Sequence, residues 1–514
     1  MARYKHYSYD QVKLLPVRYS EQILPGTFEF TLNQVIDEID LSAFDAKYQN
    51  DATGAPAYDP RILLKIILFA YSRGVIYSRR IEQLCRENVV MMALAADTQP
   101  DFTTIADFVS SSSAQIVPLF RQVLLVCDAM GLIGRDLFAI DGCKLSSNAA
   151  KEWSGTRADL KKKHEKLTRA IGVMLERHRQ ADAQEAAGEI AARERHYIET
   201  LRSRAEKIKE FLATHEENLG PTGTIRQSNI TDPESAKMKT SHGVLQGYNG
   251  VTAVDAKHQV IVHAAAFGEG QEHHLLKPMI EAVRDQAKAL GDKDDIFKTA
   301  KLTADAGYHT EANMKYVFEA GIDATIADKQ FRQRDPRFAT AERHKERARK
   351  DQGTKRLFHP RDFLYDEANR SCVCPAGQRL YKNGENVTIR GHEGMKFKAP
   401  KSACTPCGLR DRCLKHPERT AVRQVVFFNG RTKASGETFT TKMKRKIDSA
   451  LGRLIYQRRL ATAEPPFANL RHAKRLDRFT LRGRTKVNGQ WLLYCLIHNL
   501  GKIQRYGPAP APSG

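Results

Sequence analysis

Two aspartates stand at the ends of apolar segments, where they could hold metal ions. Asp141 closes the strand-like run RDLFAIDG, 135–142, and Asp305 follows the apolar part of KTAKLTADAGYHT, 298–310, just before a glycine turn. In phosphodiester chemistry, carboxylates hold two Mg²⁺ ions about 4 Å apart, and these ions activate the nucleophile and stabilise the leaving oxygen. Either aspartate alone also fits an ordinary turn cap, so neither decides the chemistry.

Glu464 is the third candidate carboxylate and lies among basic residues. It belongs to YQRRLATAEPPFANLR, 456–471, and is followed by Pro465. Proline is tolerated in a first helical turn, so Glu464 is predicted to start a helix. A carboxylate near Arg458, Arg459 and Arg471 is either a metal ligand beside DNA phosphates or part of an ordinary surface ion pair. The residue types in this segment leave both interpretations open.

The cysteines form a second group with chemical potential. Of nine cysteines, five fall between Cys372 and Cys413, and such clustering points to a metal ion in a reducing compartment. A four-thiolate structural zinc site is predicted, with the alternatives that Cys372 replaces Cys374 or that these are buried, unligated thiols. The remaining four cysteines are predicted to be buried free thiols. The predicted zinc ligands are Cys374, Cys404, Cys407 and Cys413.

The charge of the chain limits its partners. Its 514 residues carry a formal net charge of +22, which favours nucleic acid as the partner over a merely solubilising surface. The sequence has no run of 18 or more apolar residues and no signal-peptide core at its start. We therefore expect no membrane association and a cytoplasmic location with the nucleoid.

These residues are positioned by several predicted units. Asp59-Pro60 opens the first of several short helices, which end near 131 and suit either DNA contact or packing. Heptad-like spacing in 157–217 predicts a helical hairpin. Two strands around a turn at 255–258, followed by alternating helices and strands, predict a mixed α/β sheet.

The predicted boundaries follow these changes in pattern. They are a helical N-terminal domain, 1–131; a first part of the catalytic core, 132–329, with the hairpin insertion at about 150–225; a basic linker and cysteine-rich insertion, 330–437; a second part of the core with the glutamate helix, 438–505; and a disordered tail, 506–514.

Several motifs together resemble one family. Asp at the end of FAIDG, then ADAGYH, then Tyr–two residues–Arg and a following Glu are similar to bacterial insertion-sequence DDE transposases, which have an RNase H-like fold. The resemblance implies that Asp141, Asp305 and Glu464 bind two catalytic Mg²⁺ ions, which Mn²⁺ can replace.

The family's Tyr-Arg-Glu-Lys signature maps onto the segment around Glu464. By this resemblance Tyr456, Arg459 and Arg471 take its other three places. Two departures are present: arginine stands where the signature has lysine, and four residues instead of three separate Arg459 from Glu464. The basic residues near Glu464 are expected to line the DNA path: Arg458, Arg459, Arg471, Lys474, Arg475 and Arg478.

The expected function is therefore a DNA transposase that cleaves and transfers strands. It would bind double-stranded DNA at the terminal inverted repeats of its element, join the ends to target DNA, and act as a homodimer because two ends must be held together. The sequence contains no GxxxxGK[ST] phosphate loop, which agrees with a reaction that uses no ATP. The alternatives are an inactive, transposase-derived DNA-binding regulator and an RNase H-like nuclease without strand transfer.

Overall fold

The computed structural model describes residues 18–46, 56–182, 189–220, 223–240, 243–338, 357–389, 392–431 and 437–507. The chain divides into two compact units, Met1–Lys329 with Met443–Gly514, and Gln330–Lys442. Most of the predicted basic linker and of the predicted disordered tail lies outside the described residues. No helix in the described ranges is both long and apolar enough to cross a membrane.

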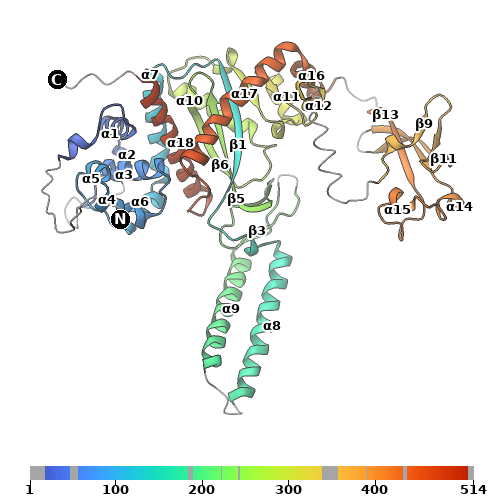
Figure 1. Ribbon diagram of the computed structural model, residues 1–514, viewed down its shortest axis with the longest axis horizontal. Coiled ribbons are helices and arrows are strands. Elements are labelled where there is room, and N and C mark those ends of the chain that lie inside the picture. Colours follow the sequence, from blue (N-terminus) through green and yellow to red (C-terminus); the bar gives the residue numbers. More distant parts are fainter. Residues whose placement is uncertain are drawn as a thin grey trace, which may run out of the picture. The chain divides into compact units, whose positions relative to one another are not determined.

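A mixed sheet forms the centre of the first unit (Figure 1). Its middle strand β1 is parallel to β7, which is parallel to β8, and β1 is antiparallel to β5 on its other side. β5 also pairs with β6 and β4. The strands are β1 (Leu137–Ser146), β4 (Ala236–Thr240), β5 (Gly243–Asp255), β6 (Ile261–Phe267), β7 (Lys301–Ala304) and β8 (Asp323–Ile326). This is the predicted mixed α/β sheet and is consistent with an RNase H-like fold.

Helices cover the sheet because its central strands are apolar on both faces. Leu137–Ile140 of β1 are all buried, as expected for a strand that packs on two sides. α17 (Ala450–Ala468) packs against β1, β5, β7 and β8, whereas α10 (Leu276–Ala289) packs against β5 and β6. α11 (Glu311–Glu319) lies beside β8, and α16 (Phe439–Asp448) precedes α17.

The N-terminal helices pack around a long C-terminal helix. α18 (Arg484–Tyr506) is buried almost all round between Gln490 and Leu500 and contacts α1, α3, α6, α7 and β6. The side chain of Asp59 accepts a hydrogen bond from the Arg61 amide at 2.7 Å, so the predicted cap is present. The helices are α1 (Phe28–Glu38), α2 (Ser42–Asp45), α3 (Pro60–Ser72), α4 (Ser78–Glu87), α5 (Val89–Leu94), α6 (Phe102–Ser111) and α7 (Ser113–Ala129), after a short 3-10 turn at Tyr19–Gln22.

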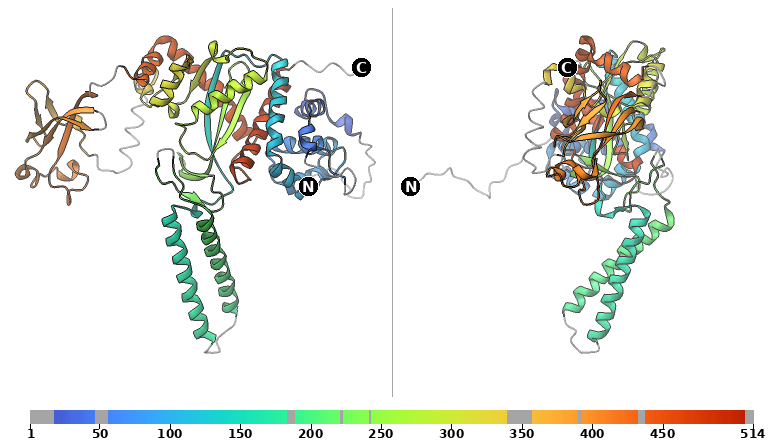
Figure 2. Two further views of the ribbon diagram at one scale, coloured as in Figure 1. Left: turned by 180° about the vertical axis from the view of Figure 1, so that it is seen from behind. Right: turned by 90° about the vertical axis from the view of Figure 1, so that its right-hand side faces the viewer.

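Two long helices occupy the segment for which a hairpin is predicted. α8 (Arg157–Asp182) and α9 (Glu189–Thr214) pack side by side along their length (Figures 1 and 2). Their base is closed by a buried apolar cluster and by two short paired strands, β2 (Ser154–Gly155) and β3 (Ser228–Asn229). The cluster contains Leu160, Ile208 and Phe211.

The second unit is a small antiparallel sheet with two short helices. Its strand order is β13-β12-β11-β10-β9, and its core is apolar, with Cys372 and Phe397 nearly inaccessible. A short helix, α12 (Phe331–Arg334), precedes it. The elements are β9 (Leu364–Asp366), β10 (Ser371–Val373), β11 (Arg379–Ile389), β12 (His392–Lys398), α14 (Lys401–Cys404), α15 (Arg410–Cys413) and β13 (Gln424–Arg431).

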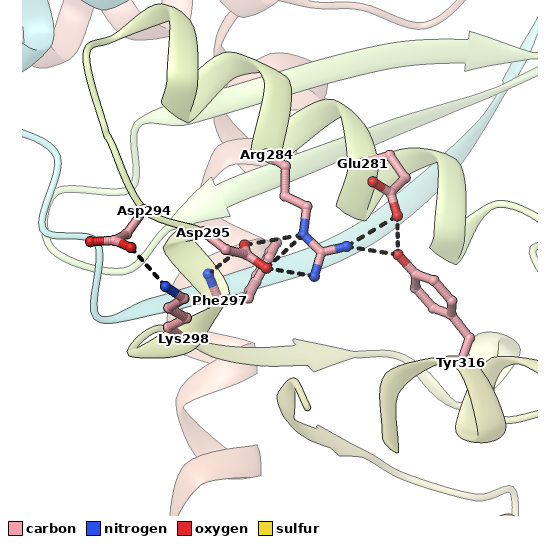
Figure 3. A network of polar contacts seen from close by, with 7 residues as sticks. All are labelled: Glu281, Arg284, Asp294, Asp295, Phe297, Lys298 and Tyr316. Carbon is pink, nitrogen blue, oxygen red and sulfur yellow. Dashed lines mark hydrogen bonds and ion pairs between the residues drawn. The ribbon is translucent and has the colours of Figure 1, made fainter. Parts of the chain in front are cut away.

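An ion-pair network holds α10 in place (Figure 3). Arg284 of α10 is largely buried and donates to Asp295 at 2.8 Å and to the Tyr316 hydroxyl at 3.0 Å. Glu281, one turn earlier on α10, also pairs with Arg284, at 3.1 Å. The network ties α10 to α11 and to the segment that enters β7.

One prediction about the glutamate helix is wrong. Glu464 does not start a helix but lies inside α17, which continues through Pro465 and Pro466. A proline within a helix removes the hydrogen bond to the carbonyl four residues earlier. For Pro465 that carbonyl belongs to Ala461, and the side chain of Gln259 donates to it at 2.9 Å instead. The Ala461 carbonyl, which Pro465 leaves without a helical hydrogen bond, therefore has a partner from another part of the fold.

Candidate active site

Strand pairing brings the two predicted aspartates together. β1 and β7 are parallel, and their last paired residues are Ile140 and Ala304. Asp141 and Asp305 are the next residues in each chain segment, and adjacent strands lie about 4.8 Å apart. The prediction that Asp141 ends its strand is wrong, because β1 continues to Ser146 against β5. Only its pairing with β7 ends there.

Arg459 bridges the two carboxylates from α17. Its Nη1 lies 2.6 Å from Oδ2 of Asp141, and its Nη2 lies 3.6 Å from Oδ1 of Asp305. The Arg459 side chain is 8% exposed, so this cation is withdrawn from water. The ring of Tyr456, one turn earlier on α17, lies 5.7 Å from the guanidinium carbon. Tyr456 and Arg459 of the predicted signature thus stand together beside the aspartates.

Burial dominates the electrostatics of Asp141. Loss of water raises the pKa of Asp141 to about 6, and the negative charge of Asp305 adds to the rise, while Arg459 opposes it. Asp305 is more open, with 43% of its side chain exposed. A carboxylate whose charged form is disfavoured by burial and by a like charge is one that a cation would stabilise.

Glu272 is a third carboxylate at this place, and it was not singled out from the sequence. It lies in the loop between β6 and α10, where Asn249 of β5 donates to its Oε1 at 3.3 Å. Burial raises the pKa of Glu272, and the charges of Asp141 and Asp305 raise it further. The sequence held one indication of this position, the predicted hairpin turn at 255–258. Because β6 runs back along β5 after this turn, the loop that follows β6 lies at the same end of the sheet as Asp141.

Two glycines allow Glu272 to come this close. A Cβ on Gly142 would stand 3.1 Å from Glu272 Oε1 and 2.7 Å from Asn249 Oδ1. A Cβ on Gly307 would collide with Glu272 Oε2. Each glycine lies within two residues of an aspartate, so the small residues that follow Asp141 and Asp305 make room for the third carboxylate.

Glu464 is placed on the outer side of α17. Its side chain is exposed, whereas Arg459, Ala463 and Pro466 are buried against the sheet. Five residues after Arg459, Glu464 is rotated by about 140° around the helix. Asp141 and Asp305 are thus the predicted acids that neighbouring strands and Arg459 bring together, and Glu464 projects from a different side of α17 than Arg459.

The donor set suits a hard divalent cation. Among the described residues, no group of three or more histidine, cysteine, aspartate or glutamate side chains forms a ready-made metal site. However, carboxylate oxygens are the ligands that Mg²⁺ prefers, and a cationic guanidinium already lies against Asp141 and Asp305. A divalent cation would meet the same electrostatic demand that Arg459 meets in part.

Two family models match the chain. A transposase DDE domain matches residues 373–504, and a transposase domain, DUF772, matches residues 17–111. The two matches indicate an insertion-sequence DDE transposase. No curated protein matches the chain. The DDE match contains Arg459 and Glu464 but begins after both aspartates, whose assignment to this site rests on strand pairing and on Arg459.

The basic residues that are predicted to line a DNA path lie in one segment, 458–478. Burial raises the pKa of Cys143 to about 12 and the charge of Arg471 opposes the rise, so Arg471 acts on β1 close to Asp141. Arg475 has a φ of 52° and packs against Gly74 after α3. Arg478 donates to Asn148 at 3.2 Å. Arg458 is exposed beside Arg459.

Lys474 opens into a cationic pocket of about 690 Å³ between α1, α3 and α18. Its Nζ lies 5.3 Å from the ring centroid of Phe28. Arg73, Lys502 and Arg505 also line this pocket. Burial lowers the pKa of Lys474, and the neighbouring charge of Arg73 lowers it further. Such a pocket suits an anion.

The four predicted zinc ligands gather in the second unit. Cys374, Cys404, Cys407 and Cys413 all line one cavity of about 30 Å³. Burial raises the pKa of Cys413, and the other three thiols add to the rise, as expected when sulfurs are close. Cys372 is instead buried in the core of the sheet, which favours Cys374 as the fourth member.

Proposed function

We propose that the chain is a DNA transposase that cleaves strands and transfers them to target DNA. The observation that carries the proposal is the pair Asp141 and Asp305, adjacent on parallel strands and bridged by the buried guanidinium of Arg459. The two family matches support a transposase, and the pair of aspartates is the proposed active site.

The residues would act on the DNA as follows. Asp141 and Asp305 would hold two Mg²⁺ ions, or Mn²⁺ in their place, and when bound these ions activate a water or 3′-hydroxyl and stabilise the leaving oxygen. Arg459 positions both carboxylates and balances their charge. Glu464, predicted from the family signature as a further ligand, remains a prediction. The substrate would be double-stranded DNA at terminal inverted repeats, held by a homodimer.

The cysteine cluster would hold a structural zinc ion. Four thiolates fill a tetrahedral shell, which leaves no open position for catalysis. The site would therefore stabilise the second unit and take no part in strand cleavage.

Replacing the aspartates one at a time tests the proposal. Asp141→Asn and Asp305→Asn keep the side-chain shape but remove the charge that a hard cation needs, so Mg²⁺-dependent cleavage of end-labelled element ends should fall by orders of magnitude. The double variant should be little worse than either single one, because residues that act as a unit are non-additive. Affinity for the DNA should persist in a gel shift, since it comes mainly from phosphate contacts.

The controls separate the alternatives. Asp294→Asn changes an exposed carboxylate that pairs with Lys298 and should cut like the parent. Joined products with a target plasmid support a transposase, and cutting without joining supports a nuclease. A parent protein that binds the DNA ends of its element in Mg²⁺ but never cuts them would support the inactive DNA-binding regulator.

A further inference from the structure

Glu272 stands in an electrostatic setting that one arginine does not balance. Three carboxylates act on one another here, and Arg459 is the cation that lies against two of them. For Glu272 itself, the contact from the structure is a neutral one, from the Asn249 amide at 3.3 Å. Loss of water disfavours the charged form of this half-buried carboxylate, and the positive charge of Lys144 only partly offsets the rise in its pKa.

Two buried polar atoms beside Glu272 also have no partner within the described residues. Asn249 is fully buried, and its Oδ1 accepts no hydrogen bond although its amide reaches Glu272. The hydroxyl of Tyr308, three residues after Asp305, is buried and unpaired as well. Buried polar atoms are nearly always satisfied in folded proteins, by protein, water or a bound ion. Both atoms are therefore open to a water molecule or a bound ion as their partner.

The backbone around Glu272 is built to admit its carboxylate. Gly142 follows Asp141 directly, and Gly307 follows Asp305 by two residues; side chains at these glycines would contact or displace the Glu272 carboxylate. The side chain of Asn313 on α11 donates to the His273 carbonyl at 2.8 Å, which holds the loop that carries Glu272. The carboxylate is thus held by a rigid part of the fold, which a metal ligand requires.

We propose that Glu272 is a metal-binding carboxylate of this site, joining Asp141 and Asp305 as a ligand of a divalent cation. The proposal rests on the proposed function and names a residue that neither the family signature nor the sequence pattern assigned. The site would then draw its carboxylates from β1, from the end of β7 and from the loop before α10.

Metal binding by the purified full-length protein tests the proposal without any cleavage assay. Titration with Mn²⁺, followed by the loss of free-ion signal in electron paramagnetic resonance, should show a Kd at least about tenfold weaker for Glu272→Gln than for the parent. Loss even of a residue that only supports a ligand costs 10–100-fold in metal affinity. Glu319→Gln, an exposed carboxylate paired with Lys315, should bind Mn²⁺ like the parent.

Thermal unfolding gives a second readout that a merely structural role would not produce. Because Glu272 lies close to Asp141 and Asp305, their negative charges repel one another in the metal-free protein, and the neutral Gln should raise its Tm. The increase in Tm on adding Mn²⁺ should shrink in the same variant, since it follows the affinity for the ion. A metal-free Tm that falls together with an unchanged Mn²⁺ increment would overturn the proposal.

Comparing Mn²⁺ affinity in the aspartate and Glu272 variants separates a failure of the Glu272 proposal from a failure of the proposed metal site. If Asp141→Asn weakens Mn²⁺ binding and Glu272→Gln does not, Glu272 is not a ligand and the proposed function stands. If none of the carboxylate variants affects Mn²⁺ binding, the metal site itself is wrong. Glu464→Gln is titrated alongside; a loss in that variant with parent-like binding in Glu272→Gln would give the place to Glu464.

Discussion

The Nη1 of Arg459 donates a hydrogen bond to Oδ2 of Asp141 at 2.6 Å, although 318 positions separate the two residues in sequence. The same guanidinium reaches Asp305, so one side chain from α17 connects the ends of two neighbouring strands. The charge of both aspartates is thereby coupled to a single residue.

Metal binding should depend on pH near the titration of Asp141. Burial raises its pKa to about 6, so below that pH the carboxyl holds a proton and is neutral. A hard cation binds the carboxylate, hence affinity for Mn²⁺ should increase as pH rises through about 6 and level off above it. Titration of the parent between pH 5 and 8 checks this, and a flat profile would contradict it.

Removing Arg459 should move that profile to higher pH. Its positive charge lowers the pKa of Asp141, so Arg459→Gln should leave Asp141 protonated at pH values where the parent is charged. The midpoint of the Mn²⁺ titration against pH is the quantity to compare. Arg458→Gln alters the exposed neighbour on α17 and should keep the parent midpoint. A midpoint that stays in place in both variants would remove Arg459 from the site.

A single methyl group at Gly142 should disturb the site. Gly142→Ala would place its Cβ 2.7 Å from Asn249 Oδ1, and relieving such a contact typically costs about 1–3 kcal/mol. Urea unfolding measures the loss. Gly172→Ala is the matched control, because no atom lies within 4 Å of its added Cβ, and in helix α8 alanine should stabilise by up to about 1 kcal/mol. Equal stabilities for the two variants would contradict the crowding at Gly142.

The basic segment after α17 should carry part of the affinity for DNA. Replacing Lys474 and Arg475 with alanine should flatten the dependence of log K on log salt, because fewer counterions are released on binding. The control replaces Lys298 and Lys315, which already pair with surface carboxylates, and should keep the parent slope. A slope unchanged by the first pair would place the DNA path elsewhere.

Removal of zinc should affect the second unit alone. Purified protein should contain about one zinc ion per chain, and a chelator should unfold the unit that holds Cys374, Cys404, Cys407 and Cys413. Mn²⁺ binding by the aspartates should survive, because these residues belong to the other compact unit. Less than about half a zinc ion per chain would favour buried, unligated thiols.

The sheet and two of the site residues could be predicted from the sequence because their signals are local. FAIDG and KLTAD are short apolar runs that end in a carboxylate, and parallel neighbours then place Asp141 and Asp305 side by side. The mixed α/β class is confirmed by the order of strands around β1. Each of these two strands can be recognised from its own few residues, without knowledge of distant parts of the chain.

The positions of Glu464 and Glu272 depend on distant contacts, so the sequence alone did not supply them. Pro465-Pro466 indicated a helix start, but Gln259 donates to the carbonyl that Pro465 leaves open, and the helix passes through. The direction of Glu464 then follows from the register of α17. Glu272 has no strand-end signal of its own and reaches the site only because β6 returns along β5.

The interruption of the first unit by the second has a consequence for synthesis on the ribosome. Both aspartates and the loop of Glu272 are translated before the second unit, and α17 with Arg459 is translated after it. A chain that stops within the second unit therefore holds the acidic residues without the cation that bridges them and without the helix that covers β1, β7 and β8. Premature termination within the second unit therefore yields an incomplete site.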